Sequence, residues 1–494
     1  MNINYMKILL LSIIAALLSC SDGSSAPETP GKEGDIKLPK KEMRAVWLAT
    51  VGNMDWPKDV ASIERQKQEY IEYLEIFKQY NINTIIAQVR PMADAFYASD
   101  LEPWSEYLTG TQGKDPGYDP LKFMLEEAHK RDIEFHAWLN PYRIANNVTT
   151  FKPAASHIYN QHPEWTMTYN KLLIFRPALP EVRSFFIDVV RDLITKYDVD
   201  GVHFDDYFYP YPSTGIELDD QEDYAKYGAG YASIEDFRRG NVNKIVEDVH
   251  NLVKSTRPDV LFSISPYAVW RNKSQDPNGS DTSGLNNYDG LYADIRLWCE
   301  KGWIDYVVPQ LYASTENVAA NFIKLSEWWP KNSFDTPVLI GYGLYKFGNE
   351  KEGAIFMNPK ELETQFFYAA REEKIVGGVM FNATAFKRNS IDILSTLGKV
   401  YSEPVLVPFM GRKTLPEPSP VNNLKVSGNS LQWDAASGKD LRYVVYKVDD
   451  GNGKIVTVTT DTSYSPKAGG EYVVTALNRD NLESAVSQVV NYKK

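Results

Sequence analysis

The central part of this chain repeats a short apolar segment, a polar turn and an amphipathic helix. Helical segments such as 63–80 and 181–197 place apolar residues at i, i+3, i+4 and i+7, the spacing of one helix face. Strands that alternate with helices form βαβ units and a parallel sheet. Eight such units predict an α/β fold, a closed (β/α)8 TIM barrel with long loops. The candidate strands are 44–50, 83–91, 133–143, 200–210, 260–270, 304–312, 337–346 and 377–386.

The doubly wound open sheet is the other fold that uses βαβ units. It needs a glycine-rich turn after its first strand, where the backbone approaches a phosphate closely. The segment after the first predicted strand reads VGNMDWPKD and contains no such turn. The closed barrel, over residues 41–401, is therefore the preferred fold.

A second, all-β domain is predicted at the C-terminus. Residues 402–420 contain five prolines and read as a linker. Residues 421–494 alternate apolar and polar positions between Gly, Asn and Asp turns, which predicts a small antiparallel sandwich. Its aromatic residues resemble the core aromatics of fibronectin type III domains. Because they alternate as core positions do, a spacer or packing role is favoured over carbohydrate binding. These aromatics are Trp433, Tyr443, Tyr446 and Tyr472.

The N-terminus has the pattern of an export signal. Lys7 precedes an apolar run of about 11 residues, too short to span a membrane and typical of a signal peptide. The run ends in Leu17-Leu18-Ser19-Cys20, which resembles a bacterial lipobox and implies that Cys20 is lipidated. Residues 21–40 are polar and read as a flexible tether. We expect a lipoprotein of the cell envelope, at the outer membrane or cell surface; an ordinary signal peptide is the alternative.

Composition narrows the possible functions. The 494 residues carry a net charge of −12, which argues against a protein that binds nucleic acid. With Cys20 and Cys299 as the two cysteines, a disulfide scaffold is excluded, and Cys299 is expected to be a buried thiol. The six histidines form no HExxH motif and there is no CxxC, so no metal or other cofactor is expected. No GxSxG motif suggests a serine hydrolase.

Polar side chains recur at alternate positions near the ends of six predicted strands. Side chains of a barrel strand alternate between the interior and the exterior, and barrel enzymes keep their active sites at the carboxyl ends. A single residue of this kind could be a satisfied core polar group, but six strands with the same polarity favour a binding site. The residues are Gln88, Arg90, His136, Trp138, Asn140, His203, Asp205, Tyr207, Ser263, Ser265, Gln310, Tyr312 and Asn382.

Asp205 and Asp206 are the candidate catalytic carboxylates. In a regular strand their side chains point to opposite faces, and Asp205 follows the inward position of His203. If the pleat breaks at the strand end, Asp206 could also reach the pocket. Carboxylates among tyrosines suit glycoside cleavage, whereas a loop cap or a cation site is the alternative. The usual second carboxyl group is not clearly marked; candidates are Asp94, Glu102, Asp276, Asp281, Glu316, Glu350 and Glu352.

Ordered motifs along the barrel resemble the bacterial glycoside-hydrolase-like family 10. They include MRAVWLAT, AQVRPMADAFYASDLEPWSEYLTG, FHAWLNPYR, RPALPEVRSF, DGVHFDDYFYP, ISPYAVWR and VVPQLY. The resemblance implies hydrolysis of glycosidic bonds, with a cell-wall glycan or another extracellular polysaccharide as substrate. A glycan-binding lipoprotein without catalysis is the alternative. By position the motifs imply a site of Arg90, Asp94, Asn140, Tyr142, Arg143, His203, Asp205, Asp206, Gln310 and Tyr312. Trp138, Tyr207 and Asn382 complete the predicted substrate contacts.

Overall fold

Eight parallel strands close into a barrel in the computed structural model of the chain, which describes residues 36–411 and 414–494. Neighbouring strands follow the chain order, and the last strand pairs with the first, Met43 opposite Gly377. The predicted (β/α)8 barrel is therefore confirmed, with eight strands at the predicted places. They are β1 (Met43–Leu48), β2 (Thr84–Arg90), β3 (Glu134–Leu139), β7 (Gly201–Phe204), β8 (Leu261–Ile264), β9 (Tyr306–Val307), β10 (Val338–Tyr342) and β11 (Ile375–Met380).

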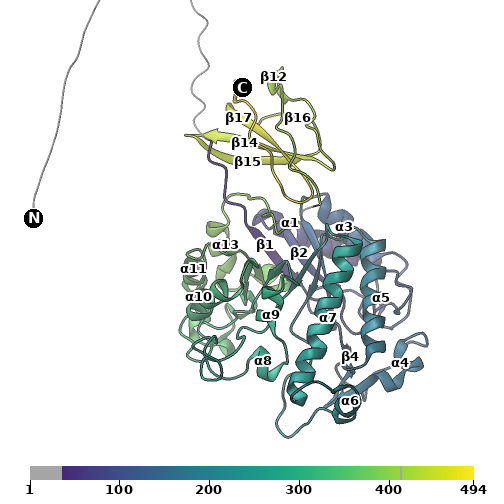
Figure 1. The fold of residues 1–494 in the computed structure, drawn as a ribbon. Helices are drawn as coiled ribbons and strands as arrows, with labels where there is room; N and C mark the ends of the chain where they lie inside the picture. The colour runs from purple at the N-terminus through teal and green to yellow at the C-terminus, as the bar shows by residue number, and fades with distance from the viewer. Residues whose placement is uncertain (1–35, 412–413) are drawn as a thin grey trace, which may run out of the picture.

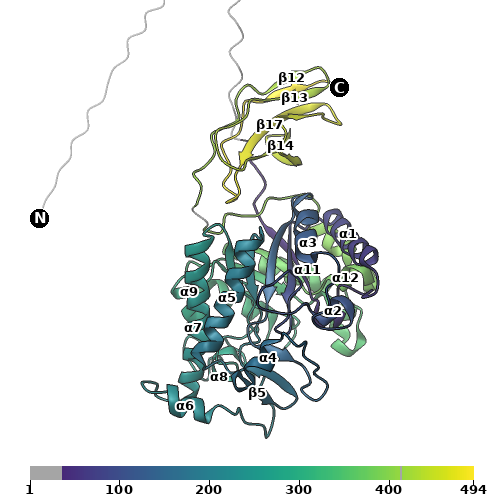
Figure 2. The same ribbon diagram turned by 90° about the vertical axis from the view of Figure 1, so that its right-hand side faces the viewer.

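Helices surround the barrel (Figures 1 and 2). The first of them, α1 (Ile63–Gln79), starts where the Ser62 hydroxyl accepts a hydrogen bond from the Arg65 backbone. It buries one apolar face against the barrel, including Leu74 and Phe77. The other helices are α2 (Glu106–Thr109), α3 (Pro120–His129), α4 (Ile158–Gln161), α5 (Pro180–Lys196), α6 (Gln221–Tyr227), α7 (Ile234–Thr256), α8 (Asn287–Gly290), α9 (Ile295–Glu300), α10 (Phe322–Asn332), α11 (Lys360–Ala369), α12 (Ala383–Arg388) and α13 (Ile393–Val400).

A small antiparallel sheet interrupts the repeat between β3 and α5. It consists of β4 (Arg143–Ala145), β5 (Thr166–Tyr169) and β6 (Leu172–Phe175), in the order β4-β6-β5. The predicted strand 133–143 was too long, because β3 ends at Leu139 and Arg143 already pairs with Ile174 of this second sheet. The sheet lies beyond the carboxyl end of β3 and thereby fixes the backbone at Arg143.

The C-terminal domain contains two antiparallel sheets, as predicted. One consists of β12 (Lys425–Ser427), β13 (Ser430–Gln432) and β16 (Ser463–Tyr464); the other of β15 (Asn452–Thr459), β14 (Arg442–Asp449), β17 (Gly470–Leu477) and β18 (Val490–Tyr492). Trp433, Tyr443, Tyr446 and Tyr472 are all buried, so these aromatics pack inside the protein instead of presenting a sugar-binding surface.

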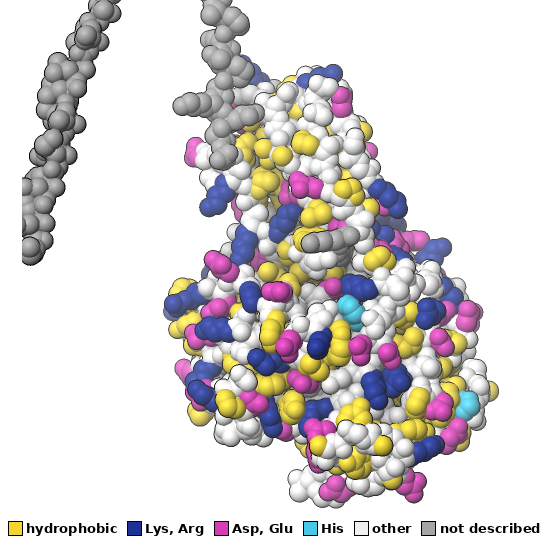
Figure 3. Space-filling view, in the orientation of Figure 1, with side chains coloured by type: hydrophobic (Ala, Val, Ile, Leu, Met, Phe, Trp, Pro, Cys, Tyr) yellow, Lys and Arg dark blue, Asp and Glu magenta, His cyan; other side chains and the backbone are white. Residues whose placement is uncertain are grey.

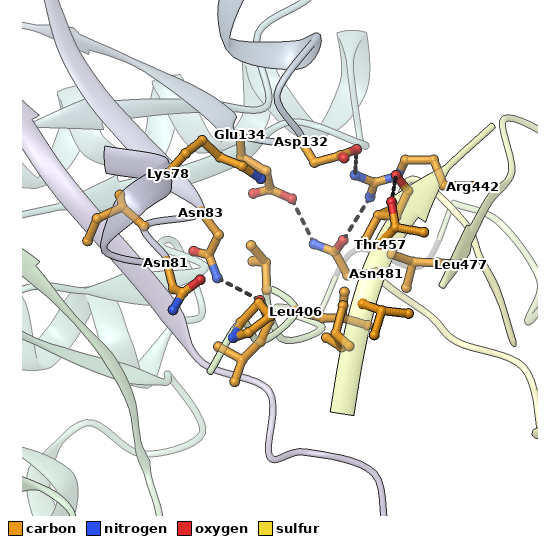
Figure 4. Close-up of a pocket in the computed structure, with 17 residues that line it drawn as sticks. Lys78, Asn81, Asn83, Asp132, Glu134, Leu406, Arg442, Thr457, Leu477 and Asn481 are labelled. Carbon is orange, nitrogen blue, oxygen red and sulfur yellow. Dashed lines mark hydrogen bonds and ion pairs between the residues drawn. The ribbon is translucent and has the colours of Figure 1, made fainter. Parts of the chain in front are cut away.

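The sandwich packs on the amino-terminal end of the barrel (Figure 1). Asn481 donates a hydrogen bond of 2.8 Å to Glu134 at the start of β3, and Arg442 lies 3.7 Å from Asp132. Asn83 donates to the carbonyl of Val405 in the linker. Figure 4 shows these side chains around a cavity of about 290 Å³ between the two domains. This end of the barrel is thus closed by the second domain.

The first described residues run along the sandwich. The backbone of Lys37 donates to Gly451 and accepts from Gly453, so the segment pairs with the start of β15. Ile36 and Leu38 pack with Leu406 and Tyr446 on the four-stranded sheet. Residues 1–20, where the signal peptide and the Cys20 anchor are predicted, lie outside the described residues. Among residues 36–411 and 414–494, no helix has the length and apolar character to cross a membrane.

Candidate active site

A cavity of about 800 Å³ opens at the carboxyl ends of the barrel strands, opposite the sandwich. Of the predicted site residues, nine line it, and they lie at or after the ends of four strands, β3, β7, β9 and β11. This volume is within the range of pockets that bind small ligands. The nine are Trp138, Asn140, Arg143, Asp205, Asp206, Tyr207, Gln310, Tyr312 and Asn382.

Both neighbouring carboxylates face this cavity. The regular pleat of β7 ends at Phe204, so Asp205 and Asp206 are free of the alternation that would separate them. The indole of Trp138 donates a hydrogen bond of 3.1 Å to Asp205, and the hydroxyl of Tyr211 donates to Asp206. Each aspartate is only 4% exposed. The strand end therefore brings two nearly buried carboxyl groups together at the cavity.

Burial raises the pKa values of the two carboxyl groups above the usual range. Burial and, after it, the neighbouring charge of Asp206 together raise the pKa of Asp205 to about 7, against the lowering effects of Arg143 and Trp138. Burial also raises the pKa of Asp206, but the hydrogen bond from Tyr211 opposes that rise. A carboxyl group with a pKa near 7 can donate a proton near neutral pH, which is the requirement for a general acid.

The raised pKa of Asp205 predicts a pH-dependent stability cost. The folded protein keeps a proton on Asp205 at a pH where the unfolded chain has released it. The free energy of unfolding therefore falls as the pH rises toward 7. In Asp205→Asn we expect the free energy of unfolding, relative to the wild type, to rise by about 2 kcal/mol from about pH 5 to about pH 7. Urea unfolding measures this difference. Exposed Asp335→Asn is the control; equal pH dependence of all three proteins would contradict the shift.

One wall of the cavity is aromatic. Trp47 of β1, Tyr312, Tyr345 and Phe381 line it. The rings of Tyr312 and Phe381 stack with centroids 5.8 Å apart, and Tyr345 meets both of them edge-on. These residues come from β1 and from the ends of β9, β10 and β11. The arrangement offers a flat apolar surface on which a sugar ring can lie.

The opposite wall is polar and comes from the ends of β2, β3 and β7. The guanidinium of Arg143 lies 3.4 Å from the centroid of the Tyr207 ring. The amide oxygen of Asn140 accepts hydrogen bonds from the backbones of Tyr142 and Arg143. In the closed barrel, β3 and β7 lie across from β10 and β11. A sugar between the two walls would therefore have Asp205 and Asp206 beside it.

Asp55, which sequence reasoning missed, orients Asn382. Its carboxylate accepts a hydrogen bond of 2.7 Å from the Asn382 amide nitrogen and others from the backbones of Ala49 and Thr384. Because a carboxylate can only accept here, the amide oxygen of Asn382 is left for the cavity. Asp55 is completely buried in the loop after β1, and no periodicity in that loop marks it.

Four predicted substrate contacts lie outside the cavity. Arg90 is completely buried, pairs with Glu102 at 2.5 Å and donates to the carbonyl of Asn140. Asp94 is also completely buried and accepts from Gln112 and the Met92 backbone; burial raises its pKa to about 6. These two residues hold the loops after β2 and β3, so they support the cavity without lining it.

The other two lie inside the protein. Tyr142 packs in the main apolar core, 1% exposed. His203 lies in the barrel interior, where its Nε2 accepts from the Trp47 indole at 3.2 Å. Its Nδ1 must then carry the proton and donate to Ser263 at 2.8 Å. Burial holds the pKa of His203 well below its usual value, so this ring is neutral and fixes Trp47.

None of the candidate second carboxylates outside the pair lines the cavity. Glu102 is paired with Arg90, Asp276 with Arg271, Asp281 with Lys324 and Glu352 with Lys346. Among the described residues, Asp205 and Asp206 are the two carboxylates that line this cavity. Nor does the described part of the chain hold a group of three or more His, Cys, Asp or Glu side chains arranged for a metal ion.

The barrel and its carboxylate-bearing cavity define the class of a glycoside-hydrolase-like protein. Residues 42–354 match the sequence model of the family Glycosyl hydrolase-like 10, and the chain belongs to this family. It is 39% identical to glycosyl hydrolase YngK of Bacillus subtilis over 98% of this chain and 99% of that one. It is 38% identical to glycosyl hydrolase DigH of Escherichia coli K12 over 75% of this chain and 91% of the relative.

The chain was also compared with solved structures. The glycoside hydrolase domain of PgaB from Bordetella bronchiseptica matches with a TM-score of 0.48 and 12% identity, over 73% of this chain and 98% of that domain.

Proposed function

We propose that the protein hydrolyses glycosidic bonds, with Asp205 as the general acid. The observation that carries this proposal is the pair of carboxyl groups in a cavity of about 800 Å³, one with a pKa of about 7. The proton of Asp205 would pass to the glycosidic oxygen as the bond to the anomeric carbon breaks. Asp206, which accepts the hydrogen bond of Tyr211, would as a carboxylate stabilise the positive charge that develops on the sugar. A water molecule would then add to the anomeric carbon and give its proton to the carboxylate of Asp205, which restores the acid.

A bacterial cell-wall glycan or another extracellular polysaccharide is the proposed substrate, reached by a chain exported and anchored through a lipid on Cys20. The aromatic wall of Trp47, Tyr312, Tyr345 and Phe381 supports a sugar ligand, and the lipobox pattern supports export to the envelope. The fibronectin type III-like domain would then be a spacer, which agrees with its buried aromatics.

A glycan-binding protein without catalysis is the second candidate. The observation in its favour is that both carboxylates come from consecutive residues on one side of the cavity, with no carboxylate on the aromatic wall among the described residues. Such a protein would bind a glycan between the two walls and release it unchanged.

A screen that detects products separates the two candidates. The purified protein is incubated with peptide-free cell-wall glycan and with a panel of neutral and anionic polysaccharides, and new reducing ends are measured by mass spectrometry. We expect products with the wild type and none above background with Asp205→Asn. Binding of a glycan with no product from any member of the panel would favour the second candidate.

A further inference from the structure

Arg143 is a cation in the cavity that forms no salt bridge with a described residue. Its charge lowers the pKa of Asp205 and of Asp206, but neither carboxylate lies within ion-pair distance of the guanidinium. Its flat face lies on the ring of Tyr207, which anchors the guanidinium at the wall. Since guanidinium N–H groups lie in the plane, this stacking leaves edges that can meet a planar acceptor side-on.

Two amides that line the same cavity, those of Gln88 and Asn140, also present donors. Gln88 accepts hydrogen bonds from the backbones of Thr50 and Val51 with its amide oxygen, so its NH₂ group remains for the cavity. The same reasoning applies to Asn140, whose oxygen is used by the backbones of Tyr142 and Arg143. The wall formed by β2 and β3 therefore presents donors, whereas Asn382 presents an acceptor from the end of β11.

The charge balance of the cavity permits an anionic ligand. When Asp205 carries its proton, the described residues that line the cavity hold at most one negative charge, on Asp206, beside the positive charge of Arg143. A ligand carboxylate next to Arg143 would then meet the cation at close range. The carboxylate would replace solvent at the edge of the Arg143 guanidinium, which forms no ion pair with any described residue.

We propose that Arg143, with the amide groups of Asn140 and Gln88, binds the carboxylate of an acidic sugar and makes the site selective for anionic glycans. The ligand class is a uronic acid or a sugar with a carboxyalkyl ether. The planar carboxylate would accept two N–H bonds from the guanidinium, the geometry in which Arg is stronger than Lys. The proposal rests on the proposed glycoside hydrolysis for its substrate but has a binding readout of its own.

The test uses substrates that differ only in charge. Peptide-free cell-wall glycan and a polyuronate are each compared with the same polymer after its carboxyl groups have been reduced to alcohols. Binding is measured by calorimetry with Asp205→Asn, and kcat/KM with the protein that has Asp205. We expect the carboxylate form to bind about 10- to 100-fold more tightly than the reduced form. Which of the two polymers shows the preference identifies the source of the acid.

Arg143→Gln should bring this ratio close to one, and Arg143→Lys should give an intermediate ratio. Arg65→Gln, which removes the same charge from the exposed side of α1, should leave the ratio unchanged. Equal binding of native and reduced glycans by the protein with Arg143 intact would overturn the proposal, as would an Arg143→Gln ratio that stays high. The first comparison needs no change at Arg143, so a folding defect cannot hide the answer.

The two hypotheses fail differently. Equal cleavage of native and reduced glycans would support hydrolysis and overturn the role of Arg143. A carboxylate preference in binding that depends on Arg143, without any product, would support the subsite and overturn hydrolysis.

Discussion

Asp205→Asn is expected to lower kcat/KM on a natural glycan by about 10³-fold. The amide cannot give a proton to the leaving oxygen, and general acid catalysis contributes about 10²- to 10⁴-fold. The substitution keeps the size of the side chain, and an amide oxygen can still accept the hydrogen bond from Trp138. The loss should therefore fall on the chemical step, visible in kcat more than in KM.

The pH profile identifies the role of this carboxyl group. With the pKa of Asp205 at about 7, kcat/KM of the wild type should fall as the pH rises above about 7, because the acid loses its proton. Asp205→Asn should lack this limb. An aryl glycoside with an acidic leaving group needs little protonation, so the variant should recover much of its activity on that substrate. Equal losses on natural and aryl substrates would assign Asp205 to binding instead.

Glu102→Gln is expected to destabilise the fold by about 3–5 kcal/mol. It removes the negative partner of Arg90 at a place where both side chains are completely buried, so the guanidinium would remain charged and unpaired. Arg90 also donates to the carbonyl of Asn140 and thereby joins the loops after β2 and β3. The shift of the urea unfolding midpoint, at unchanged slope, measures this loss.

Two further variants separate burial from charge. Glu72→Gln breaks the partly exposed pair between α1 and Lys387, and should cost less than about 1 kcal/mol. The double variant Arg90→Met/Glu102→Leu removes both buried charges and should recover most of the stability lost in Glu102→Gln. If Glu102→Gln costs no more than Glu72→Gln, the buried pair does not hold these loops together.

Periodicity predicted the barrel because strands and helices bury their apolar faces at different spacings. Segments 63–80 and 181–197 correspond to α1 and α5. The β4-β6-β5 sheet was missed, since strands of three or four residues leave too little pattern. β4 in addition depends on pairing with residues about 30 positions away, such as Arg143 with Ile174.

Alternation along the strands located the cavity but could not locate its edge. It predicted Trp138 and Asn140 at the end of β3, and both line the cavity. The same rule placed His203 and Arg90 at the site, yet both are completely buried, because an inward direction does not fix depth. Trp47 was overlooked for the opposite reason: in MRAVWLAT every residue is buried, so no polar alternation distinguishes it.

The net charge and the cysteine content exclude some classes of function but do not specify one. Cys299 is buried in α9 and its pKa is raised to about 12, as expected of a structural thiol. Charges of both signs are interspersed over the face of the barrel seen in Figure 3. The signal peptide and the lipid on Cys20 stay predictions, because those residues lie outside the part of the chain that the structure describes.

The pairing of Lys37 with Gly451 and Gly453 fixes the first described residues to the sandwich. The described chain begins beside the sandwich, while the cavity of Asp205 and Asp206 opens at the other end of the barrel. An anchor upstream of Ile36 would therefore be connected to the sandwich first. The sandwich in turn contacts the barrel, for example through the hydrogen bond from Asn481 to Glu134. With the anchor proposed on Cys20, the mouth of the cavity would open on the side of the barrel away from the anchored end of the chain.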